Sequence, residues 1–181
     1  MRLVLAIWLA VVATPAATGP VERLMEPGVV ALMRHALAPG TGDPTGFDPG
    51  DCSTQRNLDA RGRAQARRTG AALRAAGVSF DAVWTSQWCR SRDTATLMDM
   101  GTVEEKPPLN SFFAGRGDRA AQTAATLDLV SDMPDGARLL LVTHQVNITA
   151  LTGLGVASGE IIVTRRTGEG LEPVGRYVIA P

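Results

Sequence analysis

The sequence predicts an α/β fold: a three-layer α/β/α sandwich with a mainly parallel sheet. Short apolar runs, typical of strands buried on both faces, alternate with longer segments typical of helices. A chain of 181 residues, 45% of them hydrophobic, suits one globular domain. The apolar runs 29–33 and 138–143 lead into the two histidines of the chain, His35 and His144. Because ligands gather at the carboxyl ends of parallel strands, we expect both histidines at one site.

The first half of the chain contains a predicted strand, a long loop and a helix. The run 29–33 predicts the strand, and the many Gly, Pro and Asp residues of 39–53 predict a surface loop. Long loops inside compact domains are usually functional. Asp59 is expected to cap a helix that ends near Ala76. One face of this helix, which should lie close to the sheet, carries Gly62, Ala66, Gly70 and Leu73.

The second half continues the alternation. The remaining strands are predicted at 82–85, 102–104 and 138–143, and the remaining helices at 86–100 and 119–130. A closing hairpin is predicted from 161–164 and 176–179, joined through Gly168 and Gly170. Because no linker or internal repeat divides these elements, residues 19–181 are expected to form a single domain.

The amino terminus predicts export. Arg2 precedes the apolar run 3–13, and the small residues 16–19 follow it, which is the layout of a secretory signal peptide. A retained membrane anchor is the alternative interpretation. It is the weaker one, because the run is shorter than the roughly 20 residues that span a bilayer. We expect residues 1–18 to be a signal peptide, and the protein to be periplasmic or secreted with no stable membrane span after cleavage.

Export affects the oxidation state expected for Cys52 and Cys89, the only two cysteines. In an oxidising compartment they either form one disulfide or remain two buried thiols. Cys52 lies at the end of the long loop, and Cys89 directly precedes Arg90. We expect the disulfide, which would tie the loop to the predicted site.

The charge balance excludes one class of partner and favours another. The 18 basic and 18 acidic residues cancel, which argues against a general nucleic-acid binder. All basic residues except Lys106 are arginines, and the arginine fork suits bidentate binding of phosphate.

Four residues are the candidates for chemistry. Arg34 and His35 follow the first strand, Arg90 opens the helix after the strand at 82–85, and His144 follows the strand at 138–143. Two imidazoles and two guanidinium groups suit a phosphoryl group, because guanidinium groups bind its oxygens and a histidine nitrogen can attack phosphorus. A metal would need a third ligand, and no His/Cys/Asp cluster supplies one, so we expect no metal and no other cofactor.

At these positions the chain resembles the histidine phosphatase superfamily, whose fold is phosphoglycerate-mutase-like. Arg34-His35 is similar to the family's Arg-His-Gly, with Ala36 in place of glycine. The segment Leu58–Ala66 is similar to the family's Leu-Thr-x-x-Gly-x-x-Gln-Ala. The segment Ser86-x-x-x-Arg90-x-x-x-Thr94-Ala95 is similar to its second-arginine motif, and Thr143-His144 is similar to its late Ser-His or Thr-His. The resemblance implies that His35 is the nucleophile and that Arg34, Arg90 and His144 hold the phosphoryl oxygens.

The resemblance, together with the export predicted from the amino terminus, implies an exported phosphatase that hydrolyses phosphomonoesters of small molecules or envelope components through a phosphohistidine on His35. Two alternatives are a phosphohistidine (phosphoramidate) phosphatase and a non-catalytic protein that binds a phosphorylated ligand. The expected partner is a phosphorylated small molecule rather than a nucleic acid. Nothing in the sequence predicts an oligomeric state.

The proton donor departs from the family pattern. The family places a glutamate after the third strand or an aspartate after the late histidine, whereas this chain has Leu-Asn-Ser-Phe-Phe at 109–113 and Gln145. Either another carboxylate donates the proton, or the leaving group needs none. The candidate acids are Asp43, Asp48, Asp51, Glu104 and Glu105. Arg56 is a further candidate for substrate binding, and Phe112 and Phe113 are candidates for shaping specificity at the mouth.

Overall fold

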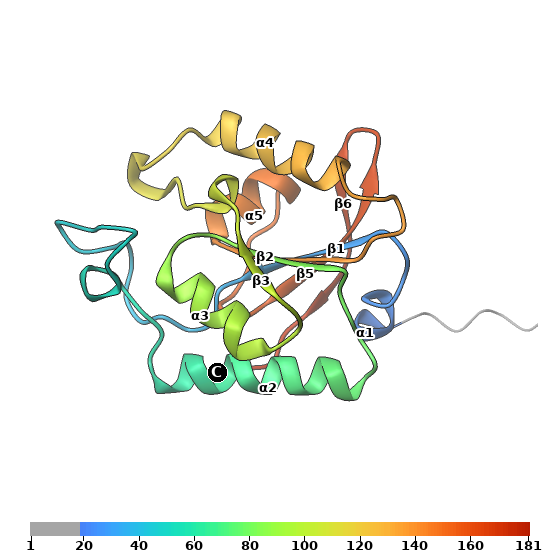
Figure 1. Cartoon of the computed structure of the whole chain (residues 1–181), viewed down its shortest axis with the longest axis horizontal. Coiled ribbons are helices and arrows are strands. Elements are labelled where there is room, and N and C mark those ends of the chain that lie inside the picture. Colours follow the sequence, from blue (N-terminus) through green and yellow to red (C-terminus); the bar gives the residue numbers. More distant parts are fainter. Residues whose placement is uncertain (1–18) are drawn as a thin grey trace, which may run out of the picture.

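The computed structural model describes residues 19–181, so the predicted signal peptide lies outside the described residues. The described part contains a six-stranded sheet with the order β3-β2-β4-β1-β5-β6 (Figure 1). Its strands are β1 (Val29–Arg34), β2 (Ala82–Thr85), β3 (Val103–Glu105), β4 (Leu139–Thr143), β5 (Ile161–Thr167) and β6 (Gly170–Tyr177). Strands β1 to β4 run parallel, while β5 pairs antiparallel with β1 and β6 pairs antiparallel with β5. The prediction of a mainly parallel α/β sheet is confirmed.

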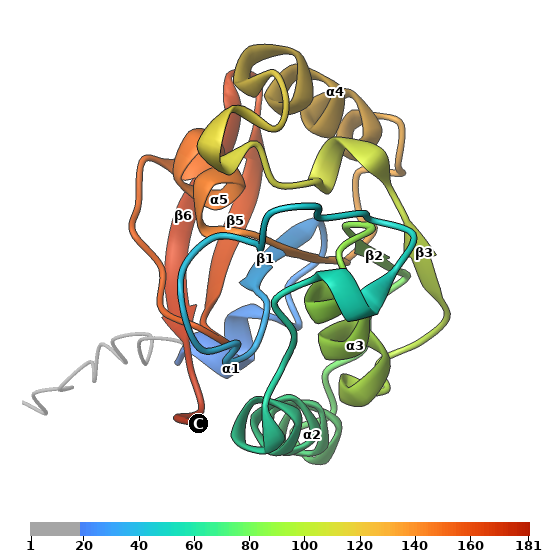
Figure 2. The same cartoon turned by 90° about the vertical axis from the view of Figure 1, so that its left-hand side faces the viewer.

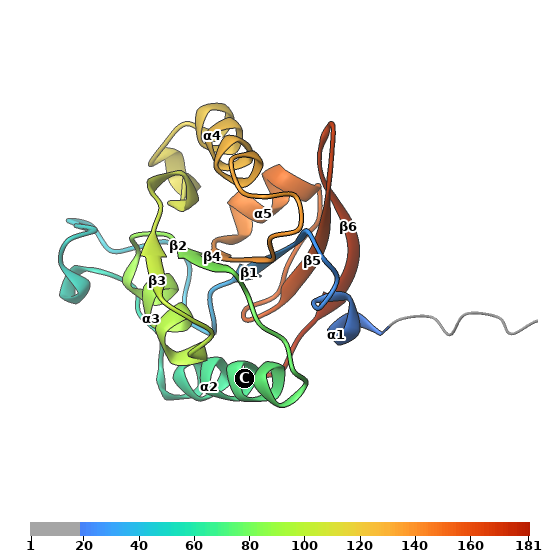
Figure 3. The same cartoon turned by 45° about the vertical axis from the view of Figure 1, so that its right-hand side comes forward.

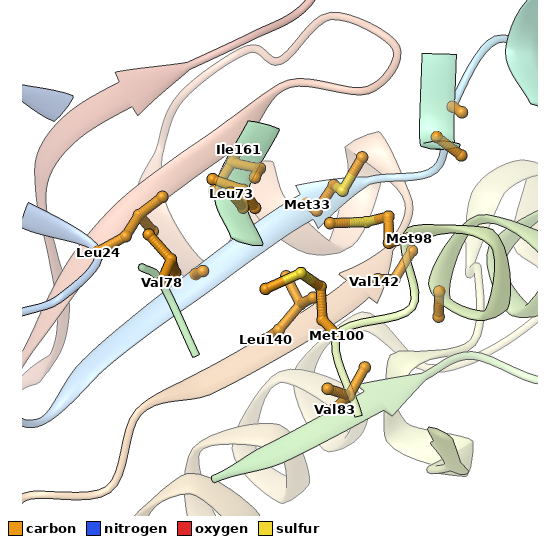
Figure 4. Close-up of a cluster of buried hydrophobic side chains, with 14 of the residues drawn as sticks. Leu24, Met33, Leu73, Val78, Val83, Met98, Met100, Leu140, Val142 and Ile161 are labelled. Atoms are coloured by element: carbon orange, nitrogen blue, oxygen red, sulfur yellow. The ribbon is translucent and has the colours of Figure 1, made fainter. Parts of the chain in front are cut away.

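Helices cover both faces of the sheet. The short α1 (Pro20–Arg23), α2 (Ala60–Ala75) and α3 (Cys89–Met98) lie on one face, and α4 (Arg119–Ser131) and α5 (Gln145–Thr152) lie on the other (Figure 3). Successive strand residues point to opposite faces, so Ala31 and Met33 enter one apolar cluster while Val30 and Leu32 enter the other. Figure 4 shows the first cluster, in which Leu73 of α2 and Met98 of α3 lie near Met33.

Helix α2 begins where the sequence predicts, and its glycines pack closely against backbone. The Asp59 carboxylate accepts a hydrogen bond from the backbone N–H of Gly62 at 2.7 Å, which caps the helix. A Cβ on Gly62 would lie 1.9 Å from the carbonyl oxygen of Leu37, and one on Gly70 would lie 1.9 Å from that of Met98. The small residues were expected to bring the helix close to the sheet. Both glycines instead bring it against the backbone after β1 and at the end of α3.

Other boundaries differ locally from the prediction. Helix α3 begins at Cys89 rather than near Ser86, because Ser86 directly follows the end of β2 and residues 87–88 form a bend. Helix α5 was not predicted: it has eight residues and includes four with β-branched side chains, which lower helix propensity. The hairpin strands β5 and β6 are longer than predicted. None of the helices within residues 19–181 is long and apolar enough to cross a bilayer.

The sheet order brings the two histidines together. Strands β1 and β4 are parallel neighbours in which Arg34 pairs with Thr143, so His35 and His144 follow at the same edge. Figure 2 looks toward this edge, with the loop between β1 and α2 on the viewer's side.

Candidate active site

A pocket of about 200 Å³ lies at this edge of the sheet. The structure brings all four predicted site residues to it, together with Arg56; its charged and imidazole lining consists of Arg34, His35, Arg56, Arg90 and His144. The rings of His35 and His144 lie edge to face, with centroids 5.5 Å apart. The neutral wall includes Ser111, Phe113 and Gln145.

The His35 imidazole is oriented from both sides. The side chain is 2% exposed, and its Nδ1 lies 2.7 Å from the carbonyl oxygen of Ala36. A carbonyl can only accept, so Nδ1 carries the proton. Nε2 in turn accepts a hydrogen bond from Nε of Arg90 at 3.2 Å. Burial, followed by the charge of Arg90, lowers the pKa of His35 well below the usual 6.5. The imidazole is therefore neutral at neutral pH, with a lone pair on Nε2.

Two polar residues hold the segment that follows His35. The hydroxyl of Thr94 accepts a hydrogen bond from the Ala36 N–H at 3.0 Å, and the Gln65 side-chain oxygen accepts one from the Leu37 N–H at 3.0 Å. The Gln65 amide also donates to the carbonyl of Ser158. These contacts give a structural reason for the Gln and Thr of the two motifs, to which the sequence assigned no role.

Arg90 directs nearly all its donors at protein groups. It is the second residue of α3 and 3% exposed. Its Nη1 donates to Oδ1 of Asp43 at 2.6 Å and to the carbonyl of Arg56 at 3.2 Å, and its Nη2 donates to Oδ2 of Asp43 at 3.2 Å. Arg90 is thus bound to the long loop on one side and to His35 on the other.

Arg34 and Arg56 bring further positive charge. Nη1 of Arg34 donates to the Val156 carbonyl at 3.0 Å, while its buried Nε has no partner. Nε of Arg56 donates to the Gly42 carbonyl at 2.7 Å. Burial and the neighbouring Arg90 lower the pKa of Arg34, and the same causes lower that of Arg56 to about 10. Three guanidinium groups that repel one another in a small pocket favour an anionic ligand.

His144 is held by a serine. Its Nε2 lies 2.8 Å from the Ser86 hydroxyl, which leaves Nδ1 as the nitrogen available to a ligand. Burial, then the neighbouring His35, lowers the pKa of His144 well below the usual 6.5. The Trp88 ring stands edge-on to the imidazole at 5.4 Å. The sequence did not predict the contact of Ser86 with His144.

The candidate acids lie outside the pocket wall, whose lining within residues 19–181 includes no carboxylate. Asp48 and Asp51 accept hydrogen bonds from the backbone of their own loop. Glu104 pairs with Lys106, and Glu105 pairs with Arg92. Asp43 is buried and paired with Arg90. Burial alone would raise its pKa, but the hydrogen bonds it accepts lower it, which keeps the carboxylate ionised and unable to donate a proton. The described residues also contain no group of three His, Cys, Asp or Glu side chains that could hold a metal ion.

Cys52 and Cys89 form a disulfide, as expected. The bond joins the end of the long loop to the first residue of α3, directly before Arg90. Arg92 contacts both sulfurs through Nη2 and Glu105 through Nη1, so its guanidinium lies away from the pocket.

The fold and this set of residues define an α/β protein with two histidines and three arginines in a pocket at one sheet edge. The family model of the histidine phosphatase superfamily (branch 1) matches residues 30–118, and the chain belongs to this superfamily. No curated protein matches the chain.

Solved structures share the fold. The chain is similar to the protein histidine phosphatase SixA complexed with tungstate, at 16% identity over 83% of this chain and 94% of that one, with a TM-score of 0.54. It is similar to a putative phosphohistidine phosphatase SixA from Nakamurella multipartita (21%, 84% and 96%, TM-score 0.60). It is also similar to a putative alpha-ribazole-5'-P phosphatase from Escherichia coli (20%, 84% and 96%, TM-score 0.61). At these identities the likeness establishes the fold.

Proposed function

We propose that the protein is a phosphatase that transfers a phosphoryl group from its substrate to Nε2 of His35 and then to water. The observation that carries this proposal is the His35 imidazole, whose Nδ1 proton is held by the Ala36 carbonyl and whose Nε2 lone pair lies in a pocket with three arginines. Membership of the superfamily supports the same reaction.

The reaction proceeds in two balanced steps. The Nε2 lone pair forms a bond to phosphorus as the bond from phosphorus to the leaving group breaks, and the leaving group takes the electron pair. A water molecule then attacks the phosphohistidine, releases inorganic phosphate and returns neutral His35. In both steps Arg34, Arg90 and His144 bind the phosphoryl oxygens and stabilise the charge of a loose transition state. The carbonyl of Ala36 stabilises the positive charge that the phosphorylated imidazole carries.

Two substrate classes follow from the pocket. Phosphoramidates, such as phosphohistidine, are favoured because the lining includes no carboxylic acid. A phosphohistidine whose ring already carries a proton on its other nitrogen releases neutral imidazole, a weak base whose conjugate acid has a pKa of about 6.5. The similarity to a protein named a protein histidine phosphatase supports this class. Phosphomonoesters of small molecules are the second class, supported by the small volume of the pocket. Their alkoxide leaving groups are much more basic and would take a proton from water.

Export is part of this proposal. Residues 1–18 have the layout of a signal peptide, and a disulfide joins Cys52 to Cys89. Disulfides persist in oxidising compartments, so we place the enzyme in the periplasm or outside the cell. There its substrates would be small phosphorylated molecules or phosphorylated envelope components.

The experiment compares wild type with His35→Ala on a panel of phosphoramidates and phosphomonoesters. We expect phosphate release and an acid-labile labelled phosphoenzyme with wild type only, and faster release from phosphoramidates than from alkyl esters. Label that is trapped equally on His35→Ala would overturn the assignment of the nucleophile. Phosphate binding without turnover of any substrate would instead indicate a binding protein.

A further inference from the structure

The Asp43 carboxylate binds groups that build the pocket without lining it. Its side chain is 4% exposed. Oδ1 accepts hydrogen bonds from Nη1 of Arg90 at 2.6 Å and from the backbone N–H of Arg56 at 3.2 Å. Oδ2 accepts from Nη2 of Arg90 at 3.2 Å and from Nε1 of Trp88 at 3.0 Å. Four donors from three residues therefore meet on one carboxylate, and all three residues lie in or beside the pocket.

These contacts of Asp43 fix the orientation of the Arg90 side chain. A carboxylate that binds both Nη atoms fixes the plane and the direction of a guanidinium group. In this orientation Nε–H of Arg90 lies 3.2 Å from Nε2 of His35. We propose that Asp43 is a positioning residue that acts through Arg90: it holds the Arg90 Nε–H beside Nε2 of His35, where a phosphoryl oxygen of the substrate replaces Nε2 as the acceptor and frees the Nε2 lone pair for attack. This inference rests on the proposed function of His35.

The same contacts argue against two other roles. A proton donor must be protonated before the leaving group departs. Burial alone would raise the pKa of Asp43, but the hydrogen bonds from Arg90 and Trp88 outweigh it and lower the pKa below its usual value. A carboxylate that merely blocked the anion site would compete with phosphate for Arg90. Asp43 instead binds the Nη side and leaves Nε directed at His35.

Further contacts hold the segment that carries Asp43 in place. It lies in the loop between β1 and α2, and the Cys52–Cys89 disulfide ties the end of that loop to α3, the helix that carries Arg90. The amide oxygen of Gln55 accepts a hydrogen bond from the Cys89 N–H at 2.9 Å. The carboxylate and its arginine are thus held on two segments that are joined covalently.

The test compares Asp43→Asn with Asp51→Asn. Both substitutions remove a carboxylate from the same loop, but Asp51 is exposed and caps a short helix, a role that asparagine also fills. For Asp43→Asn we expect weaker binding of orthovanadate and a loss of kcat/KM of about 10- to 100-fold, because a small misplacement of a positioning group costs this much. The loss should be the same for aryl phosphates with good and poor leaving groups. Asp51→Asn should match wild type.

A double-mutant cycle tests whether Asp43 acts through Arg90. Arg90→Lys keeps the positive charge and removes the planar fork. In the Arg90→Lys background we expect Asp43→Asn to change vanadate affinity less than about 3-fold, because its partner is already lost. Asp43→Glu retains the charge, and we expect its vanadate affinity to lie between those of wild type and Asp43→Asn. Circular dichroism checks the fold of each variant.

Each contrary result has a distinct meaning. A loss that grows with the basicity of the leaving group, together with loss of the basic limb of the pH profile, would make Asp43 the general acid. Tighter vanadate binding by Asp43→Asn would make it a blocking group. Equal effects in the wild-type and Arg90→Lys backgrounds would refute action through Arg90. Failure of wild type to form a phosphoenzyme would refute the proposed function instead, and the vanadate measurements would still decide the role of Asp43.

Discussion

Two segments enclose the pocket, and they are anchored by different forces. The loop between β1 and α2 is held by the Cys52–Cys89 disulfide and by the buried ion pair of Asp43 with Arg90. The segment between β3 and α4 is held by neutral hydrogen bonds. Asn110 alone makes four of these, with Gln87 through both side-chain atoms and with Gln122 and Asn147 through its carbonyl.

The two segments also bring different chemistry. The first contributes Arg56 and orients Arg90, whereas the second contributes Ser111 and the 45% exposed ring of Phe113. They meet where the Arg116 guanidinium lies 4.6 Å over the ring of Phe47. We call the first the charged segment, because it lines the pocket with Arg56, and the second the neutral segment, because it lines the pocket with Ser111 and Phe113. In the proposed reaction the charged segment would serve the phosphoryl group, which is common to all substrates, and the neutral segment would face the leaving group, which varies. Rigid anchoring is needed where charges must stay aligned.

The largest effect is expected on the charged side. Arg90→Ala should weaken orthovanadate binding on the order of 100-fold, because it removes a charged donor from the reacting centre. Arg92→Ala is the matched control: it lies on the same helix, with its guanidinium bound to Glu105 and the disulfide sulfurs. We expect it to bind vanadate as wild type does. Equal losses in a binding titration would show that the wrong arginine has been assigned to the pocket.

The second-largest effect is expected from removal of the disulfide. The bond closes a loop with a sequence separation of 37, so Cys52→Ser/Cys89→Ser should lower the free energy of unfolding by about 3 to 4 kcal/mol in the chain-entropy model. Urea unfolding measures this loss. We also expect kcat to fall, because Asp43 and Arg56 would lose their fixed positions. Unchanged kcat in the folded variant would show that the disulfide serves stability alone.

The pH dependence of stability tests the two buried imidazoles. Both folded-state pKa values lie well below 6.5, so below pH 6.5 the unfolded chain binds protons that the folded chain does not. The free energy of unfolding should therefore fall as pH drops below 6.5, by up to about 1.4 kcal/mol per pH unit for each histidine. The fall should end at the folded-state pKa values. His35→Asn should show a shallower slope, and an unchanged slope would contradict a neutral His35.

The smallest effect is expected on the neutral side. Phe113→Ala should raise KM several-fold for substrates with aromatic leaving groups, because a large half-exposed ring at the mouth offers apolar contact area. It should leave KM for small phosphoramidates unchanged. Steady-state kinetics with both substrates give the comparison. A similar change in KM for both would place Phe113 with the charged segment rather than with the leaving group.

Much of the fold was predictable because its signals are local. The apolar runs of β1, β2 and β4 have the pattern of buried strands, and Asp59 caps α2 as expected. The placement of His35 and His144 at one edge followed from a general rule of parallel sheets. The motif around Arg90 was recognised from spacing that a single helix start imposes. Helix α5 was missed because its eight residues have weak intrinsic propensity, and its packing on β1 and β4 is not visible in the sequence.

The sequence by itself determined the class of fold, the two histidines at strand ends and the arginines that accompany them. Only the tertiary structure decided which of five candidate carboxylates lies at the site: Asp43 contacts Arg90, while the others pair elsewhere. It also decided that Gly62 and Gly70 face backbone. Strand and helix patterns arise from periodicity within a few residues. The path of a long loop depends on contacts between residues far apart in the chain, such as the 47 positions that separate Asp43 from Arg90, and no local pattern records them.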